Sequence, residues 1–222
     1  RADANFDYSV TELVDGAFFN SGQSCCGIER IYVHDSLYNQ FVEAYIEKVN
    51  TLTLSNPIDP STTLGPVVKT SAADWVRQQI KGAVTQGAKP CVDTTKFHHA
   101  AEGTPYLAPE VLIDVDHSMS VMTEESFGPV VGIMSVGNDE QAIHLMNDSD
   151  LGLTASLWTQ DQSAGEHLGN RLQTGTVFMN RCDYLDPALT WTGIKNTGRG
   201  ATLSVLGYQQ LTQPKSFHLK NV

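Results

Sequence analysis

The sequence lacks several features that would assign it to a common functional class. No apolar run approaches the ~20 residues of a membrane-spanning helix, and the first five residues lack the apolar core of a signal peptide. Basic residues are few, because 14 Lys and Arg stand against 25 Asp and Glu, a formal net charge of -11. This acidity argues against nucleic acid and against anionic membranes as partners. We therefore expect an enzyme of the cytoplasm or of an organelle matrix.

Cysteine is also scarce. The four cysteines, at positions 25, 26, 91 and 182, match neither a disulfide framework nor the paired C-x-x-C arrangement of a zinc site. Reduced thiols are the simpler expectation. The adjacent His98 and His99 are expected to be exposed on a loop rather than to bind metal, and we predict no metal site.

Helical and extended periodicities alternate along the chain. The pattern predicts helices over 7–19, 36–49, 71–84, 138–146 and 160–172, and strands over 31–33, 130–136, 153–159 and 175–180. This alternation predicts an α/β fold, with a twisted, mostly parallel sheet flanked by helices. Residues 1–210 are expected to form one domain. Residues 211–222 are expected to form a tail with an alternating segment suited to pairing, as an edge strand, with another chain.

Several side chains are expected to end these helices. Asp35 or Ser36 should cap the second helix, and Ser71 with Asp74 resembles a capping box for the third. Gly87 should close that third helix in a left-handed conformation. Asn138, with Gln141 three residues on, should open the helix that follows the strand over 130–136.

The strongest signal for chemistry is segment 18–26, which reads FFNSGQSCC. It places Cys25 directly after a helix, on a turn that contains glycine. A thiolate in such a place is suited to act as a nucleophile in covalent catalysis, with flanking backbone N–H groups to hold an oxyanion. A buried core thiol is the competing interpretation, since free cysteine is among the most buried residue types.

The segment FNSGQSC over 19–25, continuing to Glu29 and Arg30, closely resembles the active-site signature of the aldehyde dehydrogenase superfamily. The resemblance implies that Cys25 attacks the aldehyde, that the thiohemiacetal passes hydride to a nicotinamide, and that water hydrolyses the resulting thioester. Cys26 holds the neighbouring position and is not the nucleophile. By the same resemblance, Ser24 and Cys26 are expected beside the substrate pocket.

A second motif, TEESFGP over 123–129, resembles the E-E-x-F-G-P motif of the same family. The resemblance implies that Glu125 binds the ribose hydroxyls of NAD or NADP and that Phe127 abuts the nicotinamide. A carboxylate accepting from two hydroxyl donors is chemically sensible at that place. Taken without the resemblance, adjacent carboxylates before a turn predict only a solvated corner.

A third stretch, 172–180, and the spacing of glycines over 193–200 also match the family, so the resemblance spans the whole chain. It implies that Leu185 and Trp191 line the tunnel for the aldehyde and that Asn180 orders the active-site loop. Ordinary loop packing is the competing interpretation. Residues 190–193 read TWTG where many relatives carry a proline and a second glycine, which leaves the particular aldehyde open.

Two further family motifs do not occur in the sequence. The E-L-G-G-K motif that carries the general base is missing, and so is a G-x-G-x-x-G phosphate-binding loop. The resemblance therefore implies the C-terminal, catalytic portion of the enzyme without its cofactor-binding domain. Such a portion is expected to be inactive alone, with a parent that is a homodimer or homotetramer acting on a small-molecule aldehyde.

Three alternatives stay open at this point. A thiol hydrolase or acyltransferase would need a histidine poised on Cys25. A CoA-acylating or NADP-preferring member of the superfamily would share all three motifs. A non-enzymatic module that retains the fold would serve in assembly, and the tail over 211–222 is compatible with that role.

Overall fold

The computed structural model describes residues 1–182 and 184–222. The helices are α1 (Phe6–Phe18), α2 (Tyr38–Val49), α3 (Thr70–Thr85), α4 (Ser120–Thr123), α5 (Asp139–Asn147), α6 (Gln162–Gly169) and α7 (Ser204–Gln210), with 3-10 turns η1 (Phe19–Gly22) and η2 (Thr94–Lys96). The strands are β1 (Arg30–His34), β2 (Lys89–Pro90), β3 (Glu110–Ile113), β4 (Val130–Val136), β5 (Leu151–Gly152), β6 (Thr154–Leu157), β7 (Thr176–Met179) and β8 (Ile194–Lys195). Helices and strands alternate, which confirms the predicted α/β class.

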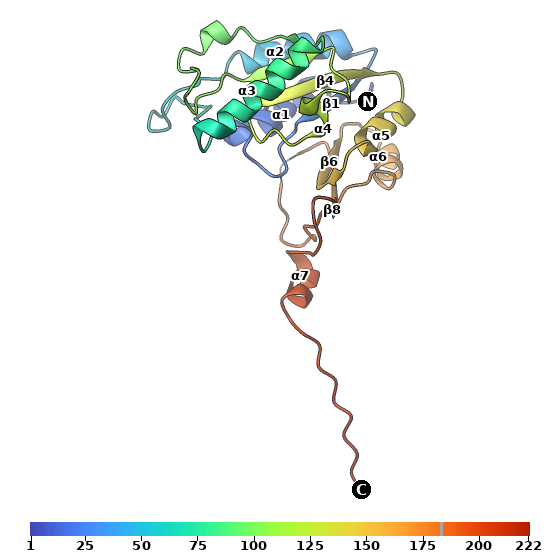
Figure 1. The fold of residues 1–222 in the computed structure, drawn as a ribbon. Helices are drawn as coiled ribbons and strands as arrows, with labels where there is room; N and C mark the ends of the chain where they lie inside the picture. Colours follow the sequence, from blue (N-terminus) through green and yellow to red (C-terminus); the bar gives the residue numbers. More distant parts are fainter. Residues whose placement is uncertain (183) are drawn as a thin grey trace.

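The main sheet has four strands in the order β1-β4-β3-β2 (Figure 1). β1, β4 and β3 are parallel, and the two-residue β2 pairs antiparallel with β3. Two smaller sheets pair β6 with β7 in parallel and β5 with β8 antiparallel. The expectation of a single sheet is thus corrected, since the described strands form three sheets, although three of their five strand pairs are parallel. The antiparallel pairs involve strands too short to leave any periodicity in the sequence.

Helices cover both faces of the main sheet (Figure 1). Along β4, Val131 and Ile133 pack in the core that α1 and α2 supply, whereas Val130 packs in the core under α3 and α4. β3 divides in the same way, with Val111 in the first core and Leu112 in the second. Because alternate side chains of a strand face opposite sides, each strand is buried on both faces. This explains the nearly unbroken apolar run of β4.

Some predicted helix ends are confirmed and two are wrong. The Asn138 side chain accepts a hydrogen bond from the N–H of Gln141 at 2.9 Å, and Gly87 is left-handed, with φ +113°. The N-cap of α2, however, is Leu37 rather than Asp35 or Ser36. Both of those side chains instead engage the His34 imidazole, through Nδ1 contacts of 3.0 Å and 2.9 Å. They are therefore unavailable to the helix.

The predicted capping box of α3 is also wrong. The helix starts one residue earlier, and its N-cap is Lys69, with no side-chain hydrogen bond to the first turn. Asp74 accepts instead from the guanidinium of Arg77 at 2.8 Å, an i,i+3 ion pair within the helix. Asp74 thus pairs with Arg77, three residues further along the helix, and not with the first turn.

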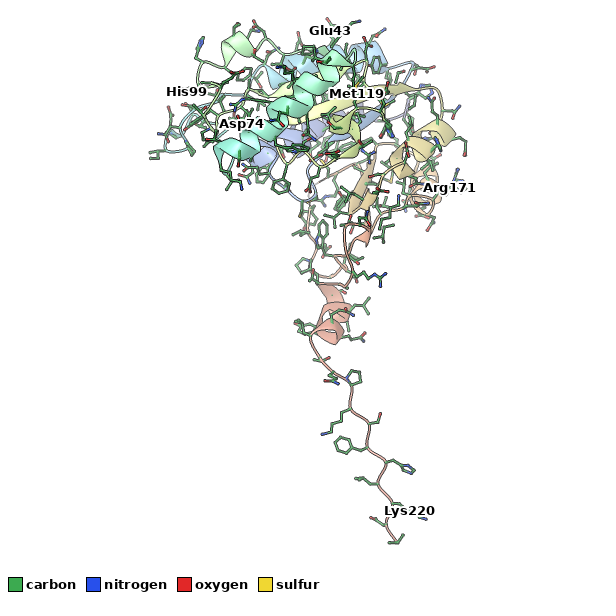
Figure 2. The ribbon with its side chains drawn as sticks, viewed as in Figure 1. Glu43, Asp74, His99, Met119, Arg171 and Lys220 are labelled. Atoms are coloured by element: carbon green, nitrogen blue, oxygen red, sulfur yellow. The ribbon has the colours of Figure 1, made fainter. Side chains whose placement is uncertain are left out.

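The C-terminal segment extends away from the rest of the molecule (Figure 1). Residues 211–222 are exposed and form neither helix nor strand, with Lys220 near the far end in Figure 2. α7, which precedes them, was not predicted from the sequence, because its seven residues show no helical periodicity of apolar side chains. Within the described parts of the chain, no helix combines the length and the apolar character needed to cross a membrane.

Candidate active site

Two motifs separated by a hundred residues meet at one end of the main sheet. Residues 19–29, here called the cysteine loop, lead into β1, and residues 124–129, the acidic loop, lead into β4. β1 and β4 are parallel neighbours with Arg30 opposite Gly132, so the two loops reach the same end of the sheet. The carbonyl oxygen of Glu29 also accepts from the N–H of Gly132 at 3.1 Å, which extends the ladder into the cysteine loop.

The cysteine loop has three residues near its start in the left-handed backbone conformation. Asn20, Ser21 and Gly22 are all left-handed, with φ of 49°, 59° and 73°. The side-chain amide of Asn20 donates to the carbonyl of Gln23 at 3.0 Å and so closes the turn. After this turn Cys25 is exposed.

Contacts with the segment before α3 fix the cysteine loop in place. The hydroxyl of Ser21 donates to the carbonyl of Gly65 at 2.7 Å, and the side chain of Gln23 accepts from the N–H of Val68 at 2.8 Å. Cys26 is only 3% exposed and its sulfur lies 3.5 Å from the hydroxyl of Ser24. One of the two neighbouring thiols is therefore presented to solvent while the other packs inside.

The acidic loop is held through its backbone. The Glu29 carboxylate accepts from the N–H of Ser126 at 3.0 and 2.9 Å and from the N–H of Phe127 at 3.0 Å. From α3, the indole N–H of Trp75 donates to the carbonyl of Glu125 at 3.3 Å. Phe127 is left-handed, with φ 52°, and its ring is 40% exposed.

Burial and hydrogen bonding act on the pKa of Glu29 in opposite senses. Burial raises the pKa of its carboxyl, and the nearby charge of Glu125 adds to this, while the N–H donors of Phe127 and Ser126 lower it. The net shift is upward. A carboxylate so enclosed is stabilised mainly by the two amides that it accepts from.

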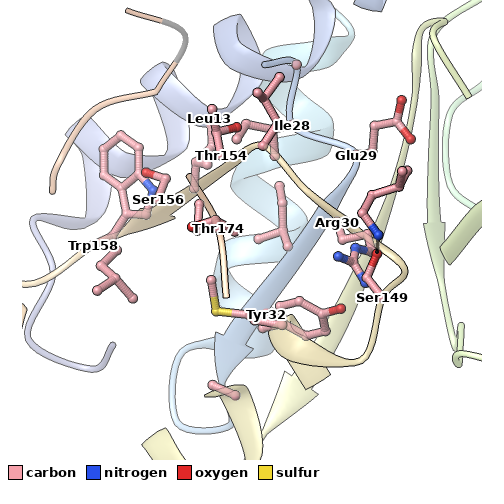
Figure 3. Close-up of a pocket in the computed structure, with 18 of the residues that line it drawn as sticks. Leu13, Ile28, Glu29, Arg30, Tyr32, Ser149, Thr154, Ser156, Trp158 and Thr174 are labelled. Atoms are coloured by element: carbon pink, nitrogen blue, oxygen red, sulfur yellow. Dashed lines mark hydrogen bonds between the residues drawn. The ribbon is translucent and has the colours of Figure 1, made fainter. Parts of the chain in front are cut away.

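A cavity of about 650 Å³ lies beside the two loops (Figure 3). Ser24, Cys25, Glu125 and Trp191 line it, so four of the residues named from sequence share one space. Much of the remaining wall comes from β1 and from residues 149–158. A mixed apolar and polar cavity of this size suits a small organic ligand.

Figure 3 shows how the wall of this cavity is arranged. Glu29 and Arg30 lie on one side of the view, and Trp158 and Ser156 on the other, with Thr154 and Thr174 between them. The labelled side chains come from segments that are far apart in the sequence.

Tyr32, also in this wall, belongs to a chain of hydrogen-bonded side chains. Its hydroxyl lies 2.8 Å from Nε2 of His117, whose Nδ1 lies 2.8 Å from the carboxylate of Asp148. Burial raises the pKa of Tyr32 to about 12, so the phenol is protonated at neutral pH. No histidine occurs among the described residues that line the cavity, which gives no support to a histidine-activated hydrolase.

The other residues named from sequence lie outside this lining. Leu185 is 52% exposed, and it, Phe127 and Cys26 are not among the described residues that border the cavity. Asn180 binds the backbone of Thr159 with both ends of its amide, at 3.0 and 2.7 Å. It thereby links the end of β7 to the end of β6.

Sequence reasoning missed Glu29 and Trp75 as residues that build the site. Glu29 was part of the quoted signature, and a charged residue immediately before a half-buried strand is itself a signal that it has a fixed partner. Trp75 carried no such signal. In the described residues no group of three or more His, Cys, Asp or Glu is placed to hold a metal ion.

The sequence was compared with known proteins. A model of the aldehyde dehydrogenase family matches residues 1–217. The chain belongs to the aldehyde dehydrogenase family. Succinate-semialdehyde dehydrogenase [NADP(+)] 1 of Mycobacterium ulcerans is 32% identical over 96% of this chain and 46% of its own length. Retinal dehydrogenase 2 of Gallus gallus is 31% identical over 99% of this chain and 42% of its own.

Solved structures of aldehyde dehydrogenases share the fold. Betaine aldehyde dehydrogenase of Staphylococcus aureus, in complex with NAD+, superposes with a TM-score of 0.86 at 30% identity, over 93% of this chain and 41% of that one. An NADP-dependent glyceraldehyde-3-phosphate dehydrogenase from Bacillus halodurans, complexed with NADP, gives 0.83 at 33% identity, over 90% and 41%. The chain thus spans about half the length of the relatives that it matches.

Proposed function

We propose that this chain is the C-terminal, catalytic portion of an NAD(P)-dependent aldehyde dehydrogenase, with Cys25 as its nucleophile. The observation that carries the proposal is the meeting of the cysteine loop and the acidic loop, which places Cys25 and Glu125 on one cavity. Membership of the aldehyde dehydrogenase family supports the reaction class.

In the proposed reaction the thiolate of Cys25 attacks the aldehyde carbon, and a carbon–sulfur bond forms as the carbonyl oxygen gains negative charge. Backbone N–H groups of the cysteine loop are the local donors for that oxygen. Loss of hydride from the same carbon gives a thioester. Water then cleaves the carbon–sulfur bond, which releases the acid and restores the thiol.

The residues present fit the nicotinamide side of a dinucleotide. Glu125 offers an exposed carboxylate, an acceptor for ribose hydroxyls, and the exposed ring of Phe127 offers an apolar surface for the nicotinamide. When bound, the nicotinamide ring accepts the hydride. Trp191 borders the cavity on the substrate side in this proposal, with Leu185 further out.

Two parts of the reaction are assigned to residues that this sequence does not contain. Neither the E-L-G-G-K motif, with its general-base Glu, nor a G-x-G-x-x-G loop occurs in it. We propose that a further stretch of polypeptide supplies the base and the dinucleotide-binding domain, and that the chain alone does not turn over.

The exposed tail completes the proposal. Residues 211–222 expose Phe217 at 72% and Leu219 at 85%, alternate positions that suit one face of an edge strand. We assign this segment to pairing between subunits in a homodimer or homotetramer.

The decisive experiment follows NADH or NADPH formation with a panel of aldehydes. Three samples are compared: this chain, the intact protein in which it occurs, and that protein with Cys25→Ala. We expect turnover in the intact protein only, with loss in the variant. A Cys26→Ala variant is the matched control, since its buried neighbouring thiol is assigned no chemistry.

Two results would contradict the proposal. Turnover that persists in the Cys25→Ala protein would remove the assigned nucleophile. Turnover by this chain alone would refute the assignment of base and cofactor binding to other residues. Thioester hydrolysis that proceeds without any nicotinamide would instead favour a thiol hydrolase.

A further inference from the structure

A side chain outside the assigned chemistry connects the cysteine loop to the acidic loop. Glu29 follows Cys25 by four residues, and its carboxylate reaches across 97 and 98 positions of sequence to the N–H groups of Ser126 and Phe127. Both carboxylate oxygens take part, at 3.0 and 2.9 Å on Ser126. Hydrogen bonds to an ionised acceptor are roughly twice as strong as neutral ones.

The two N–H groups that donate to Glu29 belong to the peptide bonds between Glu125 and Phe127, the two residues assigned to the cofactor. The peptide that joins Glu125 to Ser126 is bound at both ends: its carbonyl accepts from Trp75, and its N–H donates to Glu29. Rotation of that peptide is thereby restricted, and the direction in which the Glu125 side chain leaves the backbone is fixed.

Phe127 is the second residue that this contact affects. An aromatic residue at φ 52° occupies a conformation that costs about 1–2 kcal/mol for an L-residue without a compensating contact. The N–H of Phe127 donates to Glu29 in that conformation, at 3.0 Å. The ring itself is 40% exposed, so the protein holds the backbone while leaving the ring free to meet a ligand.

We propose that Glu29 is a positioning residue that sets the orientation of Glu125 and Phe127 relative to the cysteine loop, and so governs how the nicotinamide end of the cofactor is held. The proposal rests on the function proposed above. It adds a residue that touches neither substrate nor cofactor and acts through two backbone amides.

The chain offers a matched control for this carboxylate. Glu110, at the start of β3, is buried, at 5% exposure, whereas Glu29 is partly buried, and it likewise accepts three backbone N–H bonds, from Cys91, Val92 and Val111 at 3.2, 3.2 and 3.0 Å. Burial raises the pKa of Glu110 just as it raises the pKa of Glu29. Its side chain holds the segment after β2 rather than the acidic loop.

The first test measures amide hydrogen exchange in this chain. Glu29→Gln keeps the shape of the side chain but replaces one acceptor oxygen and removes the charge. We expect exchange at Ser126 and Phe127 to become at least about tenfold faster, while Glu110→Gln leaves both amides unchanged and accelerates Val92 instead. Unaltered exchange at Ser126 and Phe127 in Glu29→Gln would overturn the proposal.

The second test uses the intact protein. We expect Glu29→Gln to raise the KM for NAD or NADP by about tenfold with a smaller change in kcat, and to leave the rate of Cys25 alkylation within about twofold. Glu110→Gln should change neither quantity. Faster exchange together with an unchanged KM would show that the contact is structural only, which refutes the positioning role.

A shorter carboxylate provides the variant to use if Glu29→Gln does not fold. Glu29→Asp keeps the charge but withdraws it by one methylene, so its effects on exchange and on KM should lie between those of the wild type and of complete removal. If the wild-type intact protein reduces neither NAD nor NADP with any aldehyde, the proposed function fails. The exchange result then decides by itself whether Glu29 holds the loop.

Discussion

Gly22 and Gly128 lie in direct contact, one from the cysteine loop and the other from the acidic loop. A Cβ atom on Gly22 would overlap the carbonyl oxygen of Gly128, and one on Gly128 would meet the side chain of Val76 at 2.6 Å. The approach of the two loops therefore depends on Gly22 lacking a side chain, whereas Gly128 must lack one to fit against Val76 of α3.

Replacing Gly22 by alanine is expected to destabilise the fold by more than about 2 kcal/mol. The left-handed φ of +73° and the overlap with Gly128 both oppose a Cβ there. Urea unfolding of the purified chain measures the change.

Two glycines elsewhere separate these causes. Gly103→Ala, at φ +72° with open space around it, should cost only about 1 kcal/mol, because it tests the backbone conformation alone. Gly82→Ala, inside α3 and also in open space, should stabilise the chain by about 0.5–1 kcal/mol. Equal losses at Gly22 and Gly103 would show that the contact between the loops carries no stability.

Alkylation should distinguish Cys25 from Cys26 and Cys91. Cys25 is exposed, Cys26 is buried, and burial raises the pKa of the half-buried Cys91 thiol, which lowers its thiolate fraction. We expect iodoacetamide at limiting concentration to modify Cys25 first, as read by peptide mass spectrometry. The Cys25→Ser chain should lose this early product, whereas the Cys26→Ser chain should retain it. Early modification of Cys26 or Cys91 in preference to Cys25 would contradict the assigned presentation of the nucleophile.

The accuracy of the sequence predictions follows the length and regularity of each element. Strand β4 was predicted over its full span, Val130–Val136, because a parallel strand buried on both faces leaves a nearly unbroken apolar run. β3 was missed because its first residue is Glu110, a charge that disguises a four-residue buried strand. Its carboxylate is satisfied by amides that are distant in sequence, which no local pattern reveals.

In the candidate site, residues within sequence motifs were predicted, and residues that act through tertiary contacts were not. Cys25 and Glu125 were identified through their motifs, and the parallel pairing of β1 with β4, which was not predicted, is what places the motifs together. Contacts made by one side chain with a distant backbone, as at Glu29 and Trp75, depend on tertiary placement. They become visible only once the sheet order is known.

Stability at acid pH should depend on Asp148. The hydrogen bond from His117 holds the pKa of this carboxyl below its usual value of 3.8. A lowered folded-state pKa stabilises the fold above the unfolded value, and the contribution is lost as pH falls through the folded value. The difference in free energy of unfolding between the wild type and Asp148→Asn should therefore be largest above about pH 4 and vanish at lower pH.

A double-mutant cycle tests the assigned cause of this effect. In a His117→Phe background, Asp148→Asn should leave the pH dependence of unfolding nearly unchanged, since the partner is gone. A persistent difference in that background would assign the effect to His144 or Arg30, the other nearby cations.

Asn180→Ala is expected to cost about 2–3 kcal/mol of stability. The change removes two hydrogen bonds to the backbone of Thr159, which is fully buried, and places alanine at φ 54°. Asn180→Gly relieves the conformational part and leaves the bonding part, so its loss in urea unfolding should be smaller. A greater loss with glycine than with alanine would show that the left-handed conformation is unimportant.

α1 ends at Phe18, and the left-handed run over 20–22 follows one residue later. A right-handed helix grows by adding residues of the same screw sense, so residues 20–22 would have to change conformation, against the contacts of Ser21 with Gly65 and of Gln23 with Val68, before α1 could extend. The helix is thereby prevented from elongating over the next turn and winding Cys25 into its own hydrogen-bond ladder. Residues 20–22 thus separate Cys25 from the end of α1.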